Sequence, residues 1–250
     1  MLQAEQQMKH FLSLTLLTAL SVAPSFGTIY PTTFTDAIAS NDPNDVFGDP
    51  AKFDIYSLTL SNFNIGTGEL DINIDFNYGG GFTAGAFQGF TIPGFSIGPN
   101  DVVLNVGDIF FSNSTSKFAI VMSDHDGLNQ GSLYSITATQ TSGAVLGNPA
   151  GSYRPTQAVW ADPTGASEAG TGTITATNNG GYRYDAAITV STDAAFRALL
   201  DGTYDVTFES ATCGNDVIEG TVAATATPES GTMAMLGAGL LVIGLFRRKA

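Results

Sequence analysis

A strict alternation of apolar and polar residues between Leu70 and Tyr78 constrains the fold of this chain more than any other stretch. The apolar positions are Leu70, Ile72, Ile74, Phe76 and Tyr78, and the polar residues between them are Asp71, Asn73, Asp75 and Asn77. Successive side chains of a β-strand point to opposite faces, so a period of two predicts a strand with one buried and one solvated face. A sheet that buries only one face is typically antiparallel.

Shorter alternating runs predict further strands along the chain. They lie at 56–61, 106–111, 117–123, 132–140, 171–177, 182–191, 204–208 and 216–222. Gly66 and Gly68 separate the first two strands and predict a hairpin between them. Many short strands with turn residues between them are typical of a sandwich. The sequence therefore predicts an all-β fold, an antiparallel and jelly-roll-like β-sandwich over residues 28–220.

One short helix is predicted after the strand at 182–191. Thr192 is its expected cap, and Phe196, Leu199 and Leu200 share one face. Gly202 is expected to end it.

Three segments show no clear alternation. Residues 28–50 are polar and rich in turn residues, and the signal fades again over 141–170, where Trp160 is the one large apolar residue. The glycine-rich segment 79–99 is expected to be a flexible loop, and it carries Phe82, Phe87, Phe90 and Phe95. These phenylalanines favour packing of the loop onto the sheet, with a sugar-stacking platform as the alternative.

The charge of the chain excludes one class of partner. The 23 acidic residues exceed the 9 basic ones, which gives a net charge of −14. Such a surface repels phosphate backbones, so no nucleic-acid partner is expected. Cys213 is the only cysteine, so no disulfide can form within the chain. We expect it to be a small buried residue instead of a reactive thiol.

The run Asp124-His-Asp-Gly-Leu-Asn129 is the most site-like stretch of the sequence. Asp124, Asp126 and Asn129 offer the oxygen ligands that Ca²⁺ prefers, although the spacing is not that of an EF-hand loop. The favoured interpretation is a polar turn between two strands, because Asp, Asn and Gly suit turn backbones. No cofactor is predicted, and Ca²⁺ remains the alternative.

A second oxygen-rich segment precedes the first strong strand. It contains Asp42, Asn44, Asp45 and Asp49, for which calcium is the alternative to an exposed loop.

No catalytic motif is recognisable in the sequence. Beyond His10 near the N-terminus, His125 is the only histidine, and no nucleophile elbow, zinc-ligand spacing or phosphate-binding glycine loop is found. We therefore do not expect an enzyme.

The N-terminal residues predict an export signal. Met8-Lys9-His10 supplies a basic start, and the apolar run 11–22 follows. Small residues at Ser25 and Gly27 predict cleavage after Gly27, so residues 1–27 are interpreted as a signal peptide with its own short helix.

The C-terminal residues form a three-part tail behind an Ala/Thr linker at 221–227. The tail begins with Pro228, Glu229 and Ser230, continues as an apolar helix over 233–246, and ends with the basic cluster Arg247, Arg248 and Lys249. The apolar run is shorter than the ~20 residues that cross a bilayer comfortably. The basic cluster would hold its end on the cytoplasmic side. A marginal anchor behind a short motif suggests a processing substrate, and a plain tail anchor is the alternative.

The tail at 228–250 resembles the PEP-CTERM sorting signal of Gram-negative bacteria. Pro228, Glu229, the glycine-punctuated apolar helix and the Arg247–Lys249 end match that pattern, while Ser230 stands where the family has a second proline. The resemblance implies an exosortase-like processing enzyme as a partner and transient membrane anchoring. The destination it implies is the cell surface or the extracellular polysaccharide matrix.

These features favour an exported surface or matrix protein with a structural or interaction role. The alternative is a carbohydrate-binding β-sandwich module that uses the loop phenylalanines or Trp160.

The signal at 8–27 predicts that the exported protein starts at Thr28 or within a few residues of it. N-terminal sequencing by mass spectrometry measures this directly. An exported protein that still begins at Met1 or Met8 would refute the prediction.

Overall fold

The structure is a computed structural model, and it describes residues 31–36, 46, 49–64, 67–96, 101–147 and 154–223, without the side chains of 92–96 and 101–102. The predicted signal peptide, most of the linker, and the tail with Pro228, Glu229, Ser230, Arg247, Arg248 and Lys249 lie outside the described residues. So do both predicted terminal helices. Among the residues described, no helix is long and apolar enough to cross a membrane.

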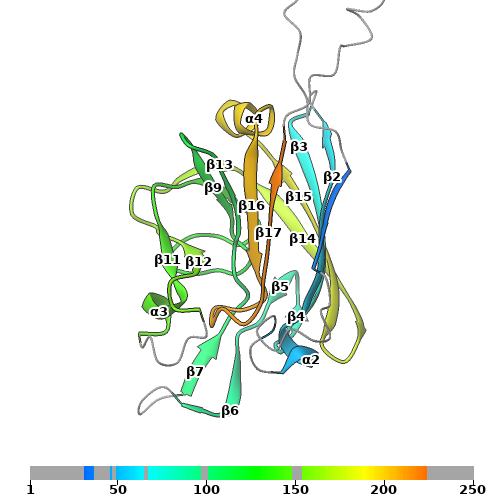
Figure 1. The fold of residues 1–250 in the computed structure, drawn as a ribbon, viewed down its shortest axis with the longest axis vertical. Coiled ribbons are helices and arrows are strands. Elements are labelled where there is room, and N and C mark those ends of the chain that lie inside the picture. Colours follow the sequence, from blue (N-terminus) through cyan, green and yellow to red (C-terminus); the bar gives the residue numbers. More distant parts are fainter. Residues whose placement is uncertain are drawn as a thin grey trace, which may run out of the picture. The chain divides into compact units, whose positions relative to one another are not determined.

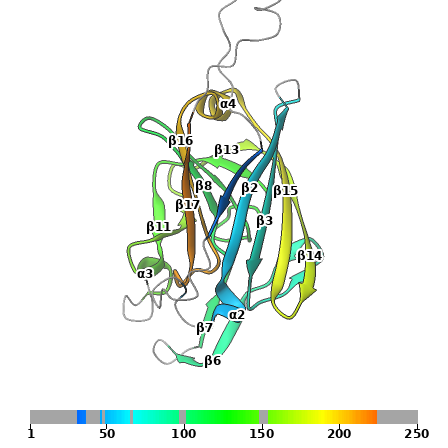
Figure 2. The same ribbon diagram turned by 45° about the vertical axis from the view of Figure 1, so that its right-hand side comes forward.

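The alternating stretch forms β3 (Glu69–Asn77), the central strand of a five-stranded antiparallel sheet. The sheet has the order β1-β2-β3-β15-β14 (Figures 1 and 2). The other strands are β1 (Thr32–Thr35), β2 (Ile55–Asn64), β14 (Gly172–Gly180) and β15 (Arg183–Ser191). The predicted hairpin joins β2 to β3, with Asn64 opposite Glu69.

The second sheet has six strands in the order β13-β10-β9-β8-β16-β17. Their bounds are β8 (Ile109–Ser112), β9 (Lys117–Ile120), β10 (Leu133–Ser135), β13 (Ser167–Gly170), β16 (Tyr204–Glu209) and β17 (Val217–Val222). Three two-stranded ribbons complete the fold. They pair β4 (Phe82–Thr83) with β5 (Ala86–Phe87), β6 (Phe90–Ser96) with β7 (Asp101–Leu104), and β11 (Thr139–Thr141) with β12 (Ala158–Ala161).

The core lies between the two large sheets. Leu70, Ile72, Ile74, Phe76 and Tyr78 are each at most 1% exposed, which confirms the predicted inner face of β3. The Phe76 ring meets the Phe208 ring of β16 edge to face, with 5.3 Å between centroids. Side chains of both sheets share one apolar cluster. The predicted all-β antiparallel sandwich is therefore confirmed.

One side of the sandwich closes where β1 meets β17. A Cβ atom at Gly220 of β17 would lie only 2.2 Å from the ring of Phe34 on β1, so only glycine fits here. The two sheets approach each other through this contact.

Helix α4 (Ala194–Leu200) is the predicted helix, and it buries Phe196, Leu199 and Leu200. Its cap is Asp193, whose carboxylate accepts a hydrogen bond from the Phe196 N–H at 2.8 Å. The expected cap, Thr192, instead donates its hydroxyl to the Gly68 carbonyl, so that assignment was wrong by one residue. Two single-turn helices that were not predicted, α2 (Pro50–Phe53) and α3 (Ser142–Val145), lie in the connections.

The segments without clear alternation contain more structure than expected. Residues 28–50 include β1, and the glycine-rich segment 79–99 includes β4, β5 and β6 instead of a single loop. The strand predicted at 132–140 divides into β10 and β11, which belong to different sheets. β17 also continues through Thr221 and Val222, two residues into the predicted linker.

Phe76→Ala should lower the free energy of unfolding by ~3–5 kcal/mol, because it removes a fully buried ring between the sheets. Asp75→Asn is the neighbouring control. It alters an exposed ion pair with Arg183, which is worth about 0–1 kcal/mol. Urea unfolding of both variants measures the difference, and equal losses would contradict the observed orientation of β3.

Candidate functional site

The Asp124–Asn129 run forms a tight turn. Asp126 and Gly127 have positive φ angles of 47° and 83°, the backbone of a two-residue type I′ turn. His125 and Leu128 flank the turn and exchange both backbone hydrogen bonds, at 3.3 and 2.7 Å. The favoured interpretation of this run as a turn is confirmed.

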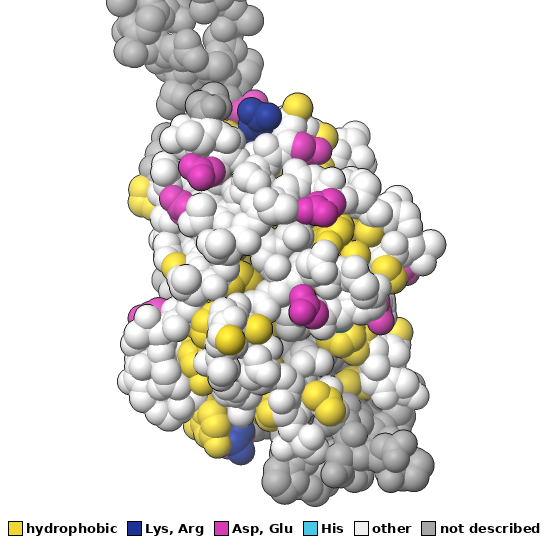
Figure 3. Space-filling view, turned by 180° about the vertical axis from the view of Figure 1, so that it is seen from behind, with side chains coloured by type: hydrophobic (Ala, Val, Ile, Leu, Met, Phe, Trp, Pro, Cys, Tyr) yellow, Lys and Arg dark blue, Asp and Glu magenta, His cyan; other side chains and the backbone are white. Residues whose placement is uncertain are grey.

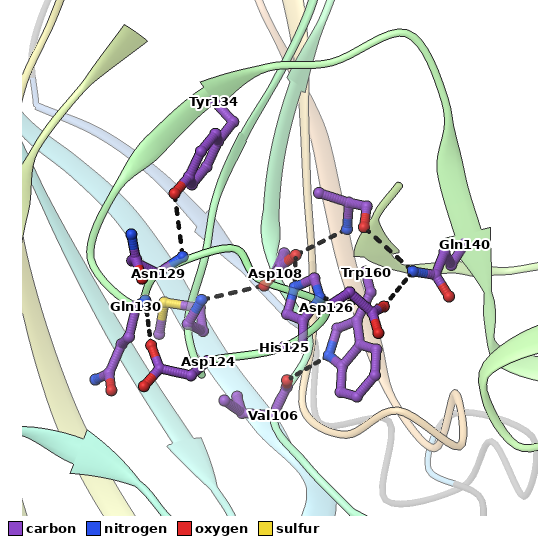
Figure 4. Close-up of polar contacts among 12 residues, drawn as sticks. Val106, Asp108, Asp124, His125, Asp126, Asn129, Gln130, Tyr134, Gln140 and Trp160 are labelled. Atoms are coloured by element: carbon purple, nitrogen blue, oxygen red, sulfur yellow. Dashed lines mark hydrogen bonds and ion pairs between the residues drawn. The ribbon is translucent and has the colours of Figure 1, made fainter. Parts of the chain in front are cut away.

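The three candidate calcium ligands do not converge on one point (Figure 4). Asp124 accepts a hydrogen bond from the Gln130 N–H at 2.7 Å, and Asp126 accepts one from the Gln140 side chain at 2.6 Å. The backbone N–H of Asn129 donates to the Tyr134 hydroxyl. In the part of the chain that the structure describes, no three His, Cys, Asp or Glu side chains group to hold a metal. The geometry gives the calcium alternative no support.

A buried carboxylate lies directly behind this turn. Asp108, at the entrance to β8, is 0% exposed and accepts three hydrogen bonds. Its Oδ1 accepts from the Met122 N–H at 3.1 Å, and its Oδ2 accepts from the Ala161 N–H at 2.9 Å. The third bond, also 2.9 Å, joins Oδ2 to Nε2 of His125. Hydrogen bonds to a charged acceptor are stronger than neutral ones, so these three offset part of the cost of burying the carboxylate.

His125 is held between Asp108 and Trp160. Its ring stacks on the Trp160 ring, with 4.4 Å between centroids and 3° between planes. The indole N–H of Trp160 reaches the Val106 carbonyl at 3.4 Å. The second ring nitrogen of His125, Nδ1, is buried and lies 3.7 Å from Oδ2 of Asp126, and no described residue forms a hydrogen bond with it.

The Asp108–His125–Trp160 cluster joins parts of the chain that are far apart in sequence. It connects the start of β8, the turn after β9 and strand β12 in one set of contacts (Figure 4). The side chains of His125 and Asp108 are 1% and 0% exposed, so no solvent-borne substrate reaches either group in this conformation. The hydrogen bond between Asp108 and His125 holds the turn after β9 against the start of β8.

Sequence reasoning selected His125 but missed Asp108. One signal was present, since Asp108 is the one charged residue of the predicted strand 106–111. A charged residue in such a run is rarely buried unless it is paired. The partner lies 17 positions away, and nothing in the sequence identifies it.

An open pocket of about 440 Å³ lies beside the turn. It is lined by the β4–β5 ribbon, by Asp124, Gln130 and Gly131, and by the first residues of β14. The Gln130 side chain bridges the pocket wall to the Gly85 carbonyl at 2.6 Å. The described residues that line it include no aromatic side chain.

The loop phenylalanines pack inward, as favoured. Phe87 is 4% exposed and meets the rings of Phe76, Tyr78 and Phe82. Phe90 is half-buried against Phe53 and Tyr78. The side chain of Phe95 lies outside the described residues.

Of the second oxygen-rich segment, only Asp49 is described. Its carboxylate caps α2 through the Ala51 N–H at 3.1 Å and pairs with Lys52 at 3.2 Å. Asp42, Asn44 and Asp45 lie outside the described residues.

The loop after β16 buries several polar groups. Cys213 is 0% exposed, and burial raises the pKa of its thiol to about 12, so it is the inert buried residue that was expected. Burial also raises the pKa of Glu209 well above its ordinary value, and neither carboxyl oxygen has a hydrogen-bond partner among the described residues. Asp216 differs, because its Oδ2 accepts from the Ile55 N–H at 2.6 Å and so ties this loop to β2.

Comparisons with known proteins identify no relative. A scan against protein-family models, a search of curated proteins and a search of solved structures each find no match to this chain.

Asp108→Ala should lower the free energy of unfolding by about 3–5 kcal/mol, because it leaves three buried donors without their acceptor. Asp108→Asn should cost about 1–3 kcal/mol, since the amide turns a donor toward one of those N–H groups.

Asp185→Asn on β15 is the matched control, an exposed carboxylate that bonds only the side chain of Asn179 among the contacts described. Its stability should change by less than about 0.5 kcal/mol. Chemical denaturation compares the three variants. An Asp108→Asn variant as stable as the control would show that the cluster does not hold the loops.

Proposed function

We propose that this chain is an exported protein with a structural or interaction role at the cell surface or in the extracellular matrix, sorted by an exosortase-like enzyme. The observation that carries the proposal is the sequence of the tail, in which three features follow one another. They are Pro228 and Glu229, then the apolar run, then Arg247 to Lys249. The membrane is a transient partner through the tail before processing, and extracellular polysaccharide is the expected environment afterwards.

The use of the reactive side chains supports a non-catalytic role. His125 and Asp108 are enclosed by their own hydrogen bonds and by Trp160. Cys213 is buried, and burial disfavours its thiolate. The described groups that most resemble catalytic residues thus take part in packing.

The outer face of the five-stranded sheet also supports an interaction role. Most of its side chains are short and polar, with Arg183 as a longer exception, and several bond to one another across strands. Thr189 donates to Asp71 at 2.7 Å, and Asn73 donates to Ser61 at 3.0 Å. Such a face is polar, and hydrogen bonds hold its side chains in place before any partner binds. Its described residues form no cleft in which acidic side chains converge. A different side of the molecule, drawn in Figure 3, shows acidic side chains set apart from one another.

The geometry favours this role over the carbohydrate-binding module. That alternative required Trp160 or one of the loop phenylalanines to present an open ring face to a sugar, and among these the side chain of Phe95 lies outside the described residues. Phe87 is buried, Phe82 and Phe90 pack on the core cluster, and Trp160 uses one ring face for His125.

Glu229→Ala should leave the tail attached, because it removes the acidic residue of the motif that the processing enzyme is proposed to read. The readout is the intact mass of the protein exported by a host that carries an exosortase-like enzyme. The parent should lack Arg247 to Ala250, and the variant should retain them. Ser230→Pro should be processed at least as well as the parent.

Glu219→Ala is the matched control, the same substitution at an exposed position of β17 ten residues earlier. It should be processed like the parent. An exported parent that keeps its tail would contradict exosortase sorting and leave the plain tail anchor. Equal processing of both alanine variants would show that Glu229 is not part of the recognised motif.

A further inference from the structure

Strand β14 leaves one long edge of the five-stranded sheet open. It is the last strand in the order β1-β2-β3-β15-β14, and it pairs with β15 from Gly172 to Gly180 (Figure 2). No other strand of the described chain pairs with its opposite side. Unpaired backbone groups along an edge form a template for another strand.

The register shows which backbone groups face outward. The Ser191 N–H donates to the Thr171 carbonyl at 2.9 Å, just before β14 begins. Hydrogen-bonded and non-bonded pairs alternate along an antiparallel ladder, so the odd-numbered residues of β14 bond to β15. The N–H and C=O groups of Ile174 and Ala176 therefore point to the open side.

The other edges of the sandwich are closed or short. β1 and β17 meet at the Phe34–Gly220 contact. β13, the outer strand of the six-stranded sheet, has four residues and exposes Glu168. The start of β14 is itself covered, because the Gly131 carbonyl lies 3.0 Å from the Cβ position of Gly172. The open stretch is therefore 174–178.

This stretch lacks the usual devices that prevent edge pairing. Proteins protect edges with lysine, proline, bulges or inward-pointing charges. Residues 172–178 contain no charged residue and no proline, and the only register shift of the β14–β15 pair lies beyond Asn178. Thr173, Thr175 and Thr177 point outward, while Ile174 and Ala176 face the core cluster.

The lack of charged residues in the open stretch of β14 indicates which partner can pair with this edge. A chain with a net charge of −14 repels its own copies over most of its surface. The open stretch of β14 carries no charge of its own, and the carboxylate opposite it in the register is Asp185 on β15, across from Thr177. An antiparallel pair of identical strands around a two-fold axis is also self-complementary, because each donor meets the equivalent acceptor.

We propose that two copies of this chain pair antiparallel through β14, around a two-fold axis between Ile174 and Asn178. The pairing joins the two five-stranded sheets into one sheet and continues the polar outer face from one copy to the next. The proposal goes beyond the proposed function and does not depend on the tail, because it follows from the open edge alone.

Variants of the full chain that each add one cysteine to Cys213, studied in mild detergent, test the pairing. Thr173→Cys, Thr175→Cys and Thr177→Cys place a thiol on the outward face of β14. Ala187→Cys is the matched control, because Ala187 lies opposite Thr175 on the same face but one strand further from the edge. The unsubstituted chain gives the background from buried Cys213 and from association through the tail.

The Thr175→Cys and Thr177→Cys chains are treated separately and as a mixture. Oxidation or a short bifunctional thiol reagent should give covalent dimers well above the Ala187→Cys level. Identical positions separate by about 7 Å for each residue from a two-fold axis, so Thr173→Cys should cross-link less. Equal cross-linking at Thr175, Thr177 and Ala187 would overturn the proposal, whether the edge is then covered by a terminal segment of the same chain or stays open.

A second pair of variants keeps the test independent of thiol chemistry. The double variant Thr175→Lys/Thr177→Lys should weaken self-association at least about tenfold in analytical ultracentrifugation, because like charges then face each other across the edge. Ala187→Lys adds one positive charge to the same face, one strand further from the edge, and should leave the association unchanged. A double variant that associates as the parent does would overturn the proposal.

Discussion

Strand β3 has one apolar face, and that face must be covered by a second layer. This requirement determines the arrangement of the molecule. Leu70, Ile72, Ile74 and Phe76 are excluded from water only if a second sheet lies against them. The six-stranded sheet supplies that cover through Phe208 and its neighbours in the shared cluster. On the opposite face of β3, Asp71, Asn73 and Asp75 remain partly or fully exposed, whereas Asn77 at its end is buried. The same strand therefore contributes to both the core and the polar surface.

The connections are held by buried polar groups instead of disulfides. With Cys213 as the only cysteine, the long connections between strands cannot be cross-linked covalently. Asp108 joins one set of connections by accepting hydrogen bonds from Met122, Ala161 and His125. Asp216 joins the loop after β16 to β2 by accepting a hydrogen bond from the Ile55 N–H. Both carboxylates are 0% exposed, and each joins segments that are far apart in the sequence.

The strongest sequence signals were local in origin. The inner face of β3, the β2–β3 hairpin and helix α4 follow from spacing within about ten residues, and each is confirmed. The errors arise where a partner is distant. β1 and β12 are short, and they are strands because β2 and β11 lie beside them. The predicted strand 132–140 divides because its two ends pair with β9 and β12, in different sheets.

The sequence by itself determined the all-β class, the buried face of β3 and the turn at Asp126-Gly127, because side-chain alternation and backbone preference act between near neighbours. It also supplies the terminal segments on which the proposed sorting depends. Only the tertiary structure decided that Asp108 meets His125 and Trp160, and that β14 has an open edge. These outcomes depend on which strands become neighbours, and packing of the whole sandwich selects those neighbours.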